Sequence, residues 1–235
     1  MVLGTLEIAT GAFNLVFVGI STLVGFMIMS RYFRYKEINL LLVGLSWIGV
    51  GSPYWASSIS FLLALTIGVG LSLQGFLFFA IFFVPIFLTF WVIAFTNFLY
   101  PNKQKVILTI YLIDAVLFEV FFLYYLFTTP DLIGELDGIV NMRFKSFVMI
   151  WLFIHVILFM ITGLLFAGKA LKSDAKKNKT RGIFITIAFI SFTIGSAFNV
   201  IAPTAFIISR IILIISAISF YLGWITPRWL VKKID

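Results

Sequence analysis

The chain has 235 residues, of which 62% are hydrophobic and 11% are charged. A soluble globular domain carries about 25% charged residues, so the composition excludes an ordinary soluble protein. Cysteine is absent, which excludes disulfides, thiolate chemistry and cysteine-bound metals. The net charge of +8 lies at the ends of apolar runs, which is typical of membrane orientation. We therefore expect a lipid bilayer, and not a nucleic acid, as the partner.

The first apolar run, residues 8 to 30, exceeds the roughly 18 residues that mark a membrane span, so it predicts a transmembrane helix. No basic region or small-residue cleavage pattern precedes it, and we expect it to be retained. Residues 38 to 102 then hold no formal charge, and as one helix they would reach about 98 Å, about three times the hydrocarbon core. Because both flanks are basic, we expect two crossings, over residues 38 to 66 and 71 to 100, with a turn around Gly68.

The remaining apolar runs predict four more helices. Two of them cover residues 105 to 127 and 144 to 168. The last run contains Pro203, which predicts a break and two spans, over residues 182 to 202 and 205 to 226. The fold class expected is therefore all-α: a polytopic seven-transmembrane helix bundle that forms a single domain over residues 1 to 235.

Lysine and arginine predict the orientation of this bundle. Of the 17, 14 fall in four links that share one side, which are residues 31 to 36, 103 to 105, 169 to 181 and 228 to 233. By the positive-inside rule this side is cytoplasmic, so we expect the N-terminus outside and the C-terminus in the cytoplasm of a cell-membrane protein. Arg143 and Lys145 are exceptions in the outer link, and we attribute them to nearby acids, which are Asp131, Glu135 and Asp137.

Two prolines inside the spans predict breaks. Pro85 removes a helix hydrogen bond and its ring clashes with the carbonyl of Ile81, so we expect a kink there. Pro53 predicts a similar break in the outer half of the second span. The neighbouring Tyr54 and Trp55 are interpreted as an aromatic belt at the outer interface or as the lining of a ligand entrance.

Four ionisable residues inside the spans are the candidate ligand-binding or proton-linked site: Asp114, His155, Glu119 and Arg210. An ionisable group at mid-bilayer costs at least about 2.5 to 3.5 kcal/mol, so each should lie beside a partner, protein or trapped water. Asp114 lies about 15 Å from the cytoplasmic start of its helix, and His155 about 16 Å from the outer start of the next. These matching depths predict an Asp114–His155 pair.

Glu119 lies about 13 Å and Arg210 about 9 Å below the outer surface, a difference that their long side chains can span. We therefore predict a second pair, Glu119 with Arg210, and a cavity on the outer side from which both pairs are reached. Glu119 is about 140° further round its helix than Asp114, so the two acids need separate partners or a wide cavity.

Two interpretations of these residues stay open. Buried polar contacts hold transmembrane helices in register, and each contributes about 1 kcal/mol or less. A midplane acid beside the only histidine is also suited to relay a proton or to sense pH.

Several enzyme and pigment classes lack their required residues. A retinal protein needs a mid-membrane lysine, and every lysine here lies at a membrane edge. A seven-helix zinc hydrolase needs several histidine and aspartate ligands, which one histidine cannot supply. The GxSG setting of a rhomboid-like serine protease and the GxGD motif of a transmembrane aspartyl protease are both missing. We therefore expect no enzyme activity, no cofactor and no metal site.

The order of spans, the outside N-terminus, the short links and the tail YLGWITPRWLVKK resemble the seven-helix sensor regions of some prokaryotic membrane signalling proteins. They are also similar to uncharacterised archaeal seven-span membrane proteins. The resemblance implies a sensory or receptor-like protein. Sensor regions usually continue into a kinase or cyclase, and only RWLVKKID follows Pro227, so we expect any signal to pass to a separate cytoplasmic protein. The basic link from Lys169 to Arg181 can dock such a partner or anionic lipid headgroups, or can act only as a topology determinant.

The predicted topology and the polar residues inside the spans suggest three hypotheses for the function. The first is a receptor-like or sensory protein with a polar intramembrane cavity. The second is a small transporter or channel in which Asp114 and Glu119 carry a proton or cation, although seven spans do not divide into two equal inverted repeats. The third is an assembly or lipid-organising subunit, for which both polar pairs would tolerate neutral substitution.

Overall fold

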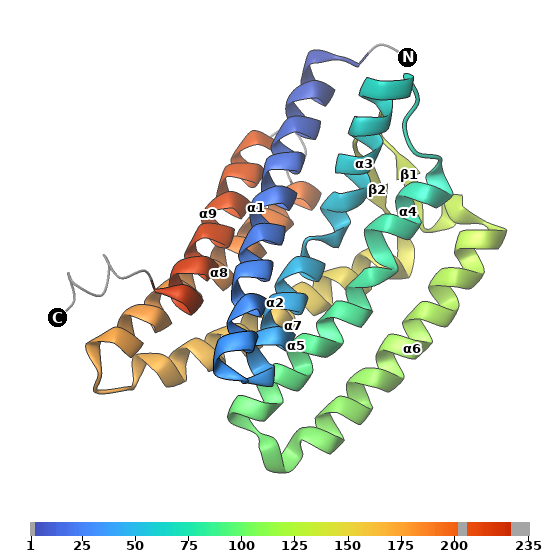
Figure 1. Ribbon diagram of the computed structural model, residues 1–235. Coiled ribbons are helices and arrows are strands. Elements are labelled where there is room, and N and C mark those ends of the chain that lie inside the picture. The colour runs from blue at the N-terminus through green and yellow to red at the C-terminus, as the bar shows by residue number, and fades with distance from the viewer. Residues whose placement is uncertain (1–2, 202–205, 227–235) are drawn as a thin grey trace.

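The computed structural model describes residues 3 to 201 and 206 to 226, and these residues form a bundle of long helices (Figure 1). In chain order the helices are α1 (Thr5–Tyr35), α2 (Ile38–Val50), α3 (Ser52–Ile67), α4 (Leu73–Ile81), α5 (Phe83–Leu99), α6 (Gln104–Thr128), α7 (Ser146–Leu171), α8 (Lys176–Ile201) and α9 (Phe206–Ile225). A short antiparallel hairpin, β1 (Gly134–Leu136) and β2 (Met142–Phe144), joins α6 to α7. The predicted all-α fold is confirmed.

Six spans in the described residues are long and apolar enough to cross a membrane, one of them built from α4 and α5 together. Helices α2 and α3 pass the same test only as a pair bent by 53°, which makes seven if the pair is one span. The chain is therefore a multi-pass α-helical membrane protein, and the helix bounds follow the predicted ranges closely. The predicted break at Pro203 lies outside the described residues.

The helix breaks occur where the prolines predicted them. Pro53 lies in the first turn of α3, directly after the bend at Gly51. Pro85 is the third residue of α5, and the helix is interrupted at Phe82, next to the carbonyl of Ile81 with which the proline ring would clash.

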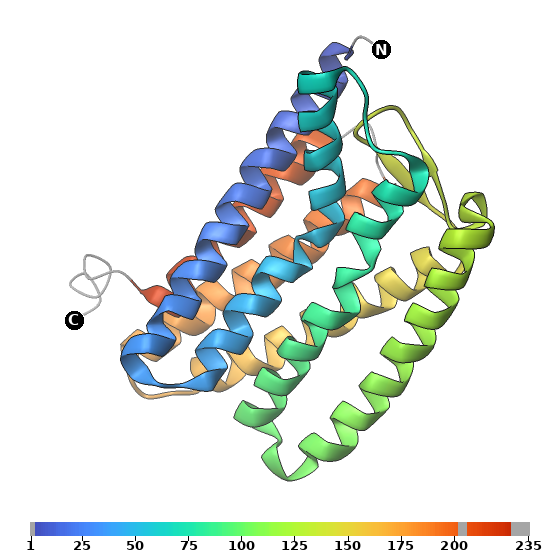
Figure 2. The same cartoon turned by 45° about the vertical axis from the view of Figure 1, so that its right-hand side comes forward.

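The helices form a ring in which chain neighbours mostly lie side by side (Figure 2). Helix α1 packs against α2, α3 and α9, while α8 lies between α7 and α9. Aromatic side chains fill the centre: Trp47 stacks on Phe220 with ring centroids 3.7 Å apart, and Trp91 contacts Phe159 and Phe189.

Helix α6 lies at the edge of this ring. Only 17% of the residues in its most apolar stretch are buried, against 28% to 44% in the five other long spans. Its closest helix neighbour is α5, and its backbone does not approach that of α7 closely in the described chain. Side chains instead bridge α6 and α7, and most of them are aromatic: Phe118 stacks on Trp151, and Phe121 and Tyr125 meet Phe147.

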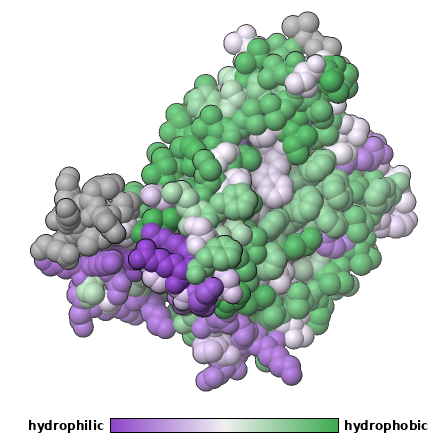
Figure 3. Space-filling model, viewed as in Figure 1, coloured by the Kyte–Doolittle hydropathy of each residue, from purple (hydrophilic) through white to green (hydrophobic). Residues whose placement is uncertain are grey.

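Basic links gather at one end of the bundle. Arg31 donates to the carbonyl of Ile225, and Arg181 donates to the hydroxyl of Thr226. Lys169, at the end of α7, donates to the carbonyl of Phe98. Figure 3 shows hydrophilic residues gathered at this end and a largely hydrophobic flank above them.

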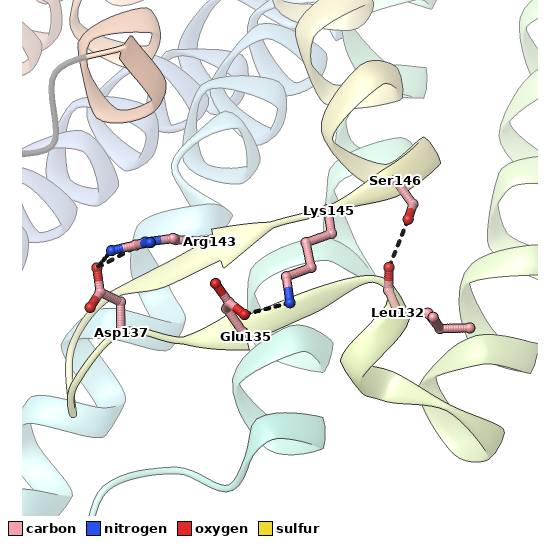
Figure 4. A network of polar contacts seen from close by, with 6 residues as sticks. All are labelled: Leu132, Glu135, Asp137, Arg143, Lys145 and Ser146. Carbon is pink, nitrogen blue, oxygen red and sulfur yellow. Dashed lines mark hydrogen bonds and ion pairs between the residues drawn. The ribbon is translucent and has the colours of Figure 1, made fainter.

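The hairpin lies at the opposite end, and ion pairs tie its two strands together (Figure 4). Glu135 of β1 lies opposite Arg143 of β2 in the antiparallel register. Arg143 donates to Asp137 at 3.0 Å, and Lys145 pairs with Glu135. The prediction that acids accompany these two basic residues is confirmed.

The turn of the hairpin packs onto the ends of α1 and α3. Ile139 and Val140 are buried against Phe61 and Ala64. The backbone N–H of Ile139 donates to the carboxylate of Glu7 at 2.8 Å, and hydroxyls from α3 donate to the carbonyls of both turn residues. The hairpin therefore covers this end of α1 and α3.

Candidate functional site

Asp114 and His155 meet between α6 and α7, as the depth argument predicted. The Nε2 atom of His155 lies 3.1 Å from Oδ2 of Asp114. Asp114 is ten residues, or about 15 Å, into α6, and His155 is nine residues, or about 14 Å, into α7. Two side chains at similar depth on helices that run in opposite directions can meet in this way.

Trp151 completes the cluster and was not predicted. Its indole N–H donates to the same Oδ2 atom of Asp114 at 3.0 Å. Trp151 is one helical turn before His155, so both project from the same face of α7, with ring centroids 3.7 Å apart. The sequence held one signal: a tryptophan N–H inside an apolar helix needs an acceptor, and Asp114 is the acid at that depth.

The contacts of the His155 ring indicate where a shared proton would lie. The Nδ1 atom of His155 lies 2.9 Å from the backbone carbonyl of Trp151, and because a carbonyl only accepts, Nδ1 carries a hydrogen. The contact between Nε2 and Oδ2 then needs one further proton, either on the imidazole, which gives an ion pair, or on the carboxyl, which gives a neutral hydrogen bond. The geometry is suited to sharing one proton between the two groups.

Tyr111 connects this cluster to the interrupted span of α4 and α5. Its hydroxyl donates to the carbonyl of Pro85 at 2.8 Å, and its ring meets the His155 ring edge-on at 6.0 Å. The side chain therefore touches the histidine on one side and the proline break on the other.

An open groove of about 270 Å³ lies beside the cluster. Its lining comes from α6 and α7 and consists of Asp114, Leu117, Phe118, Phe121, Phe147, Ile150, Trp151 and Ile154. The side chain of His155 is 9% exposed and that of Asp114 is 47% exposed. The groove thus opens sideways at the edge of the ring, whereas the sequence predicted a cavity at the outer end of the bundle. The hairpin, which forms the predicted outer link, packs on α1 and α3.

The predicted pair of Glu119 and Arg210 is wrong. Both carboxylate oxygens of Glu119 are buried without a hydrogen-bond partner in the described chain. Arg210 is 5% exposed on α9, where its guanidinium lies 4.8 Å from the ring centroid of Tyr54 and donates to the Ser209 hydroxyl. Helix α9 packs on α1 and α8, across the bundle from α6 (Figures 1 and 2). Depth alone carries no information on which helices are neighbours.

Tyr54 is also placed differently from either interpretation of the sequence. It is buried, and its ring meets Phe17 edge-on at 5.0 Å, besides the contact with Arg210. Trp55 is half-buried against Phe83 and Phe87. Tyr54 therefore belongs to the core and neither lines an entrance nor joins an interfacial belt.

In residues 3 to 201 and 206 to 226, no group of three or more histidine, aspartate or glutamate side chains is placed to hold a metal ion. Comparison with known proteins finds no family model, curated protein or solved structure that matches the chain.

Proposed function

We propose that the protein is a receptor-like seven-helix protein of the cell membrane, with its N-terminus outside and its C-terminus in the cytoplasm. Two contacts support an odd number of crossings: Glu7, in the first turn of α1, contacts the hairpin, and Ile225, the last residue of α9, contacts Arg31 at the basic end. The gathering of basic links at that end supports its cytoplasmic placement by the positive-inside rule.

The observation that carries the proposal is the Asp114–His155 contact, whose geometry suits one shared proton, in the seam between two helices whose backbones are not closely packed. If that proton is lost, the lone pair of Nε2 faces an ionised carboxylate, and the two groups repel each other. Gain of a second proton removes the ionic attraction. Either change weakens the link between α6 and α7, so the seam is a two-state element that protonation or a ligand can bias.

A change in the contact between α6 and α7 can be transmitted through α7 to the basic end of the bundle. Lys169, which donates to the carbonyl of Phe98, is two residues from the end of α7, and the basic link to α8 follows it. Arg181, in the second turn of α8, donates to the hydroxyl of Thr226 directly after α9. A shift of α7 therefore moves the link between Lys169 and Arg181, where we propose that a separate cytoplasmic signalling protein docks.

The test compares thermal stability across pH 4 to 9 for the wild type, Asp114→Asn and His155→Phe. If one proton links Nε2 to Oδ2, the melting temperature of the wild type is expected to fall when that proton is lost or a second one is gained, and both variants are expected to lose that part of the pH dependence. Asp131→Asn, which changes an acid in the exposed link before the hairpin, is the matched control and keeps the wild-type profile. If both variants also keep it, the proposed switch is refuted and a purely structural role for the pair is favoured.

A small transporter or channel is the second candidate, and Glu119 favours it. This glutamate lies on the same helix as Asp114, and both of its carboxylate oxygens are buried without a hydrogen-bond partner in the described chain. A carboxylate in that state is suited to bind and release a proton or cation. Proton or cation flux into proteoliposomes that is lost in Asp114→Asn and in Glu119→Gln would support this function, and the absence of flux in the wild type would exclude it.

A further inference from the structure

We propose that the groove between α6 and α7 binds a small apolar molecule that arrives through the bilayer and carries one hydrogen-bond-donating head, an amine or a hydroxyl. Asp114 would accept the hydrogen bond from that head. The inference rests on the receptor function proposed above and names the chemical class of its ligand.

Size favours a small molecule over a protein helix. The groove volume of about 270 Å³ is close to the lower end of small-molecule sites, which start at about 300 Å³. A helix with its side chains is about 10 to 12 Å across, too thick for a space of that volume. Six of the eight lining residues are aliphatic or phenylalanine side chains, so the body of the ligand is apolar.

The free oxygen of Asp114 determines the chemistry of the head. Oδ2 is occupied by the indole N–H of Trp151 and by His155. In the described chain Oδ1 has no hydrogen-bond partner, although the side chain lines the groove and is 47% exposed. A half-exposed carboxylate at bilayer depth is costly without a partner, and a donor on the ligand would supply one. A carboxylic acid or phosphate would be repelled instead.

Access is from the side of the bundle. Leu117, Phe121, Ile150 and Ile154 line the groove and are exposed at the surface, on helices that lie in the apolar flank. At the outer end, by contrast, the turn of the hairpin is buried against α1 and α3. A ligand that partitions into the bilayer therefore reaches Asp114 between α6 and α7 without crossing the hairpin.

Binding there would act on the shared proton. A donor on Oδ1 stabilises the ionised carboxylate, which favours the ion-paired form of Asp114 and His155. The apolar body would meanwhile rest on Leu117 and Ile150, on opposite walls of the seam. The ligand thus biases the same element that the proposed function uses.

The experiment measures saturable binding of tritiated undecylamine and tritiated 1-undecanol to the full chain in phosphatidylcholine nanodiscs, after subtraction of binding to empty nanodiscs. Both probes are expected to saturate, and undecane, which has no head, is expected to compete about tenfold or more weakly, because it lacks a hydrogen bond to a charged group. In Asp114→Asn the amine is expected to lose about tenfold in affinity and the alcohol less, because the amide keeps an acceptor but not the charge.

A second pair of variants tests the groove without touching the polar cluster. Leu117→Trp fills the groove and should abolish saturable binding of both probes. Val116→Trp places the same side chain on the neighbouring position of α6, which is 59% exposed and does not line the groove, and should bind like the wild type. Equal binding by these two variants, or competition by undecane as strong as by undecylamine, would overturn the inference.

The binding assay and the pH profile test the ligand assignment and the proposed function separately. Binding as described, together with a wild-type pH profile in Asp114→Asn, would keep the groove and refute the receptor switch. Loss of the pH profile in Asp114→Asn without saturable binding of either probe would overturn the ligand assignment and leave the proposed function in place.

Discussion

Oδ2 of Asp114 accepts from the indole of Trp151 at 3.0 Å and lies 3.1 Å from Nε2 of His155, so a single oxygen atom joins two residues of α7 to α6. Among the described residues, this oxygen is a polar link in a seam built mainly from aromatic and aliphatic side chains. Under the proposed function, a change in the protonation of this contact would change the packing of α6 on α7.

Trp151→Phe tests the indole donor. The substitution keeps an aromatic ring against Phe118 but removes the hydrogen bond to Asp114, so it should lower the free energy of unfolding by about 1 kcal/mol. Trp224→Phe is the control, because the indole nitrogen of Trp224 is buried without a hydrogen-bond partner in the described chain. Thermal unfolding in detergent measures both, and equal effects of the two substitutions would argue against a role for the indole hydrogen bond.

Glu119→Leu tests the corrected position of that glutamate. Because both carboxylate oxygens are buried without hydrogen bonds in the described chain, replacing them with an apolar side chain should raise the free energy of unfolding by about 1 to 3 kcal/mol. Chemical unfolding of the reconstituted protein gives this free energy. A decrease of similar size would mean that Glu119 has a partner.

Gly44→Ala tests the close approach of α1 and α2. A Cβ at Gly44 would lie 2.6 Å from the carbonyl oxygen of Gly25, and one at Gly25 would lie 2.7 Å from the carbonyl oxygen of Gly44. The helices would have to separate, at a cost of about 1 to 3 kcal/mol. At Gly19, also on α1, an added Cβ meets nothing within 4 Å, so Gly19→Ala should be neutral or slightly stabilising in the same thermal assay.

Gly138→Ala tests the contact between the turn of the hairpin and α1. Gly138 and Gly68 both have positive φ, 82° and 73°, so alanine strains the backbone at either position. At Gly138 the new Cβ would also lie 2.6 Å from Oε1 of Glu7, whereas at Gly68 it meets nothing within 4 Å. Gly138→Ala should therefore lower the melting temperature more than Gly68→Ala, and the reverse order would contradict the contact between the hairpin and α1.

The sequence was sufficient to predict those features that depend on one chain segment at a time. Apolar length gave the helix ranges, and Pro53 and Pro85 gave the two breaks, because both effects are local. The ion pairs of Arg143 and Lys145 were also local, since the partners lie within the same short link.

Features that depend on which helices are neighbours were predicted only in part. Matching depth was enough for Asp114 and His155, because α6 and α7 follow one another in the chain and the link between them returns the chain at the same end of the bundle. The same argument failed for Glu119 and Arg210, because α6 and α9 lie on opposite sides of the ring. The position of Tyr54 was predicted wrongly for a related reason, because the helices that surround its span decide whether its side chain faces the core. In the structure its ring packs inward, on Phe17 of α1 and Arg210 of α9.

The central claim is that the Asp114–His155 contact holds α6 and α7 together. The chain has no cysteine, so spin labels at Val106→Cys and Leu165→Cys, two exposed positions toward the basic ends of α6 and α7, report on the seam without background. Pulsed electron–electron resonance on the doubly labelled protein should give one main distance, and adding Asp114→Leu should shift or broaden it by about 2 Å or more, while Asp131→Asn leaves it unchanged. Superimposable distance distributions with and without Asp114→Leu would contradict the claim.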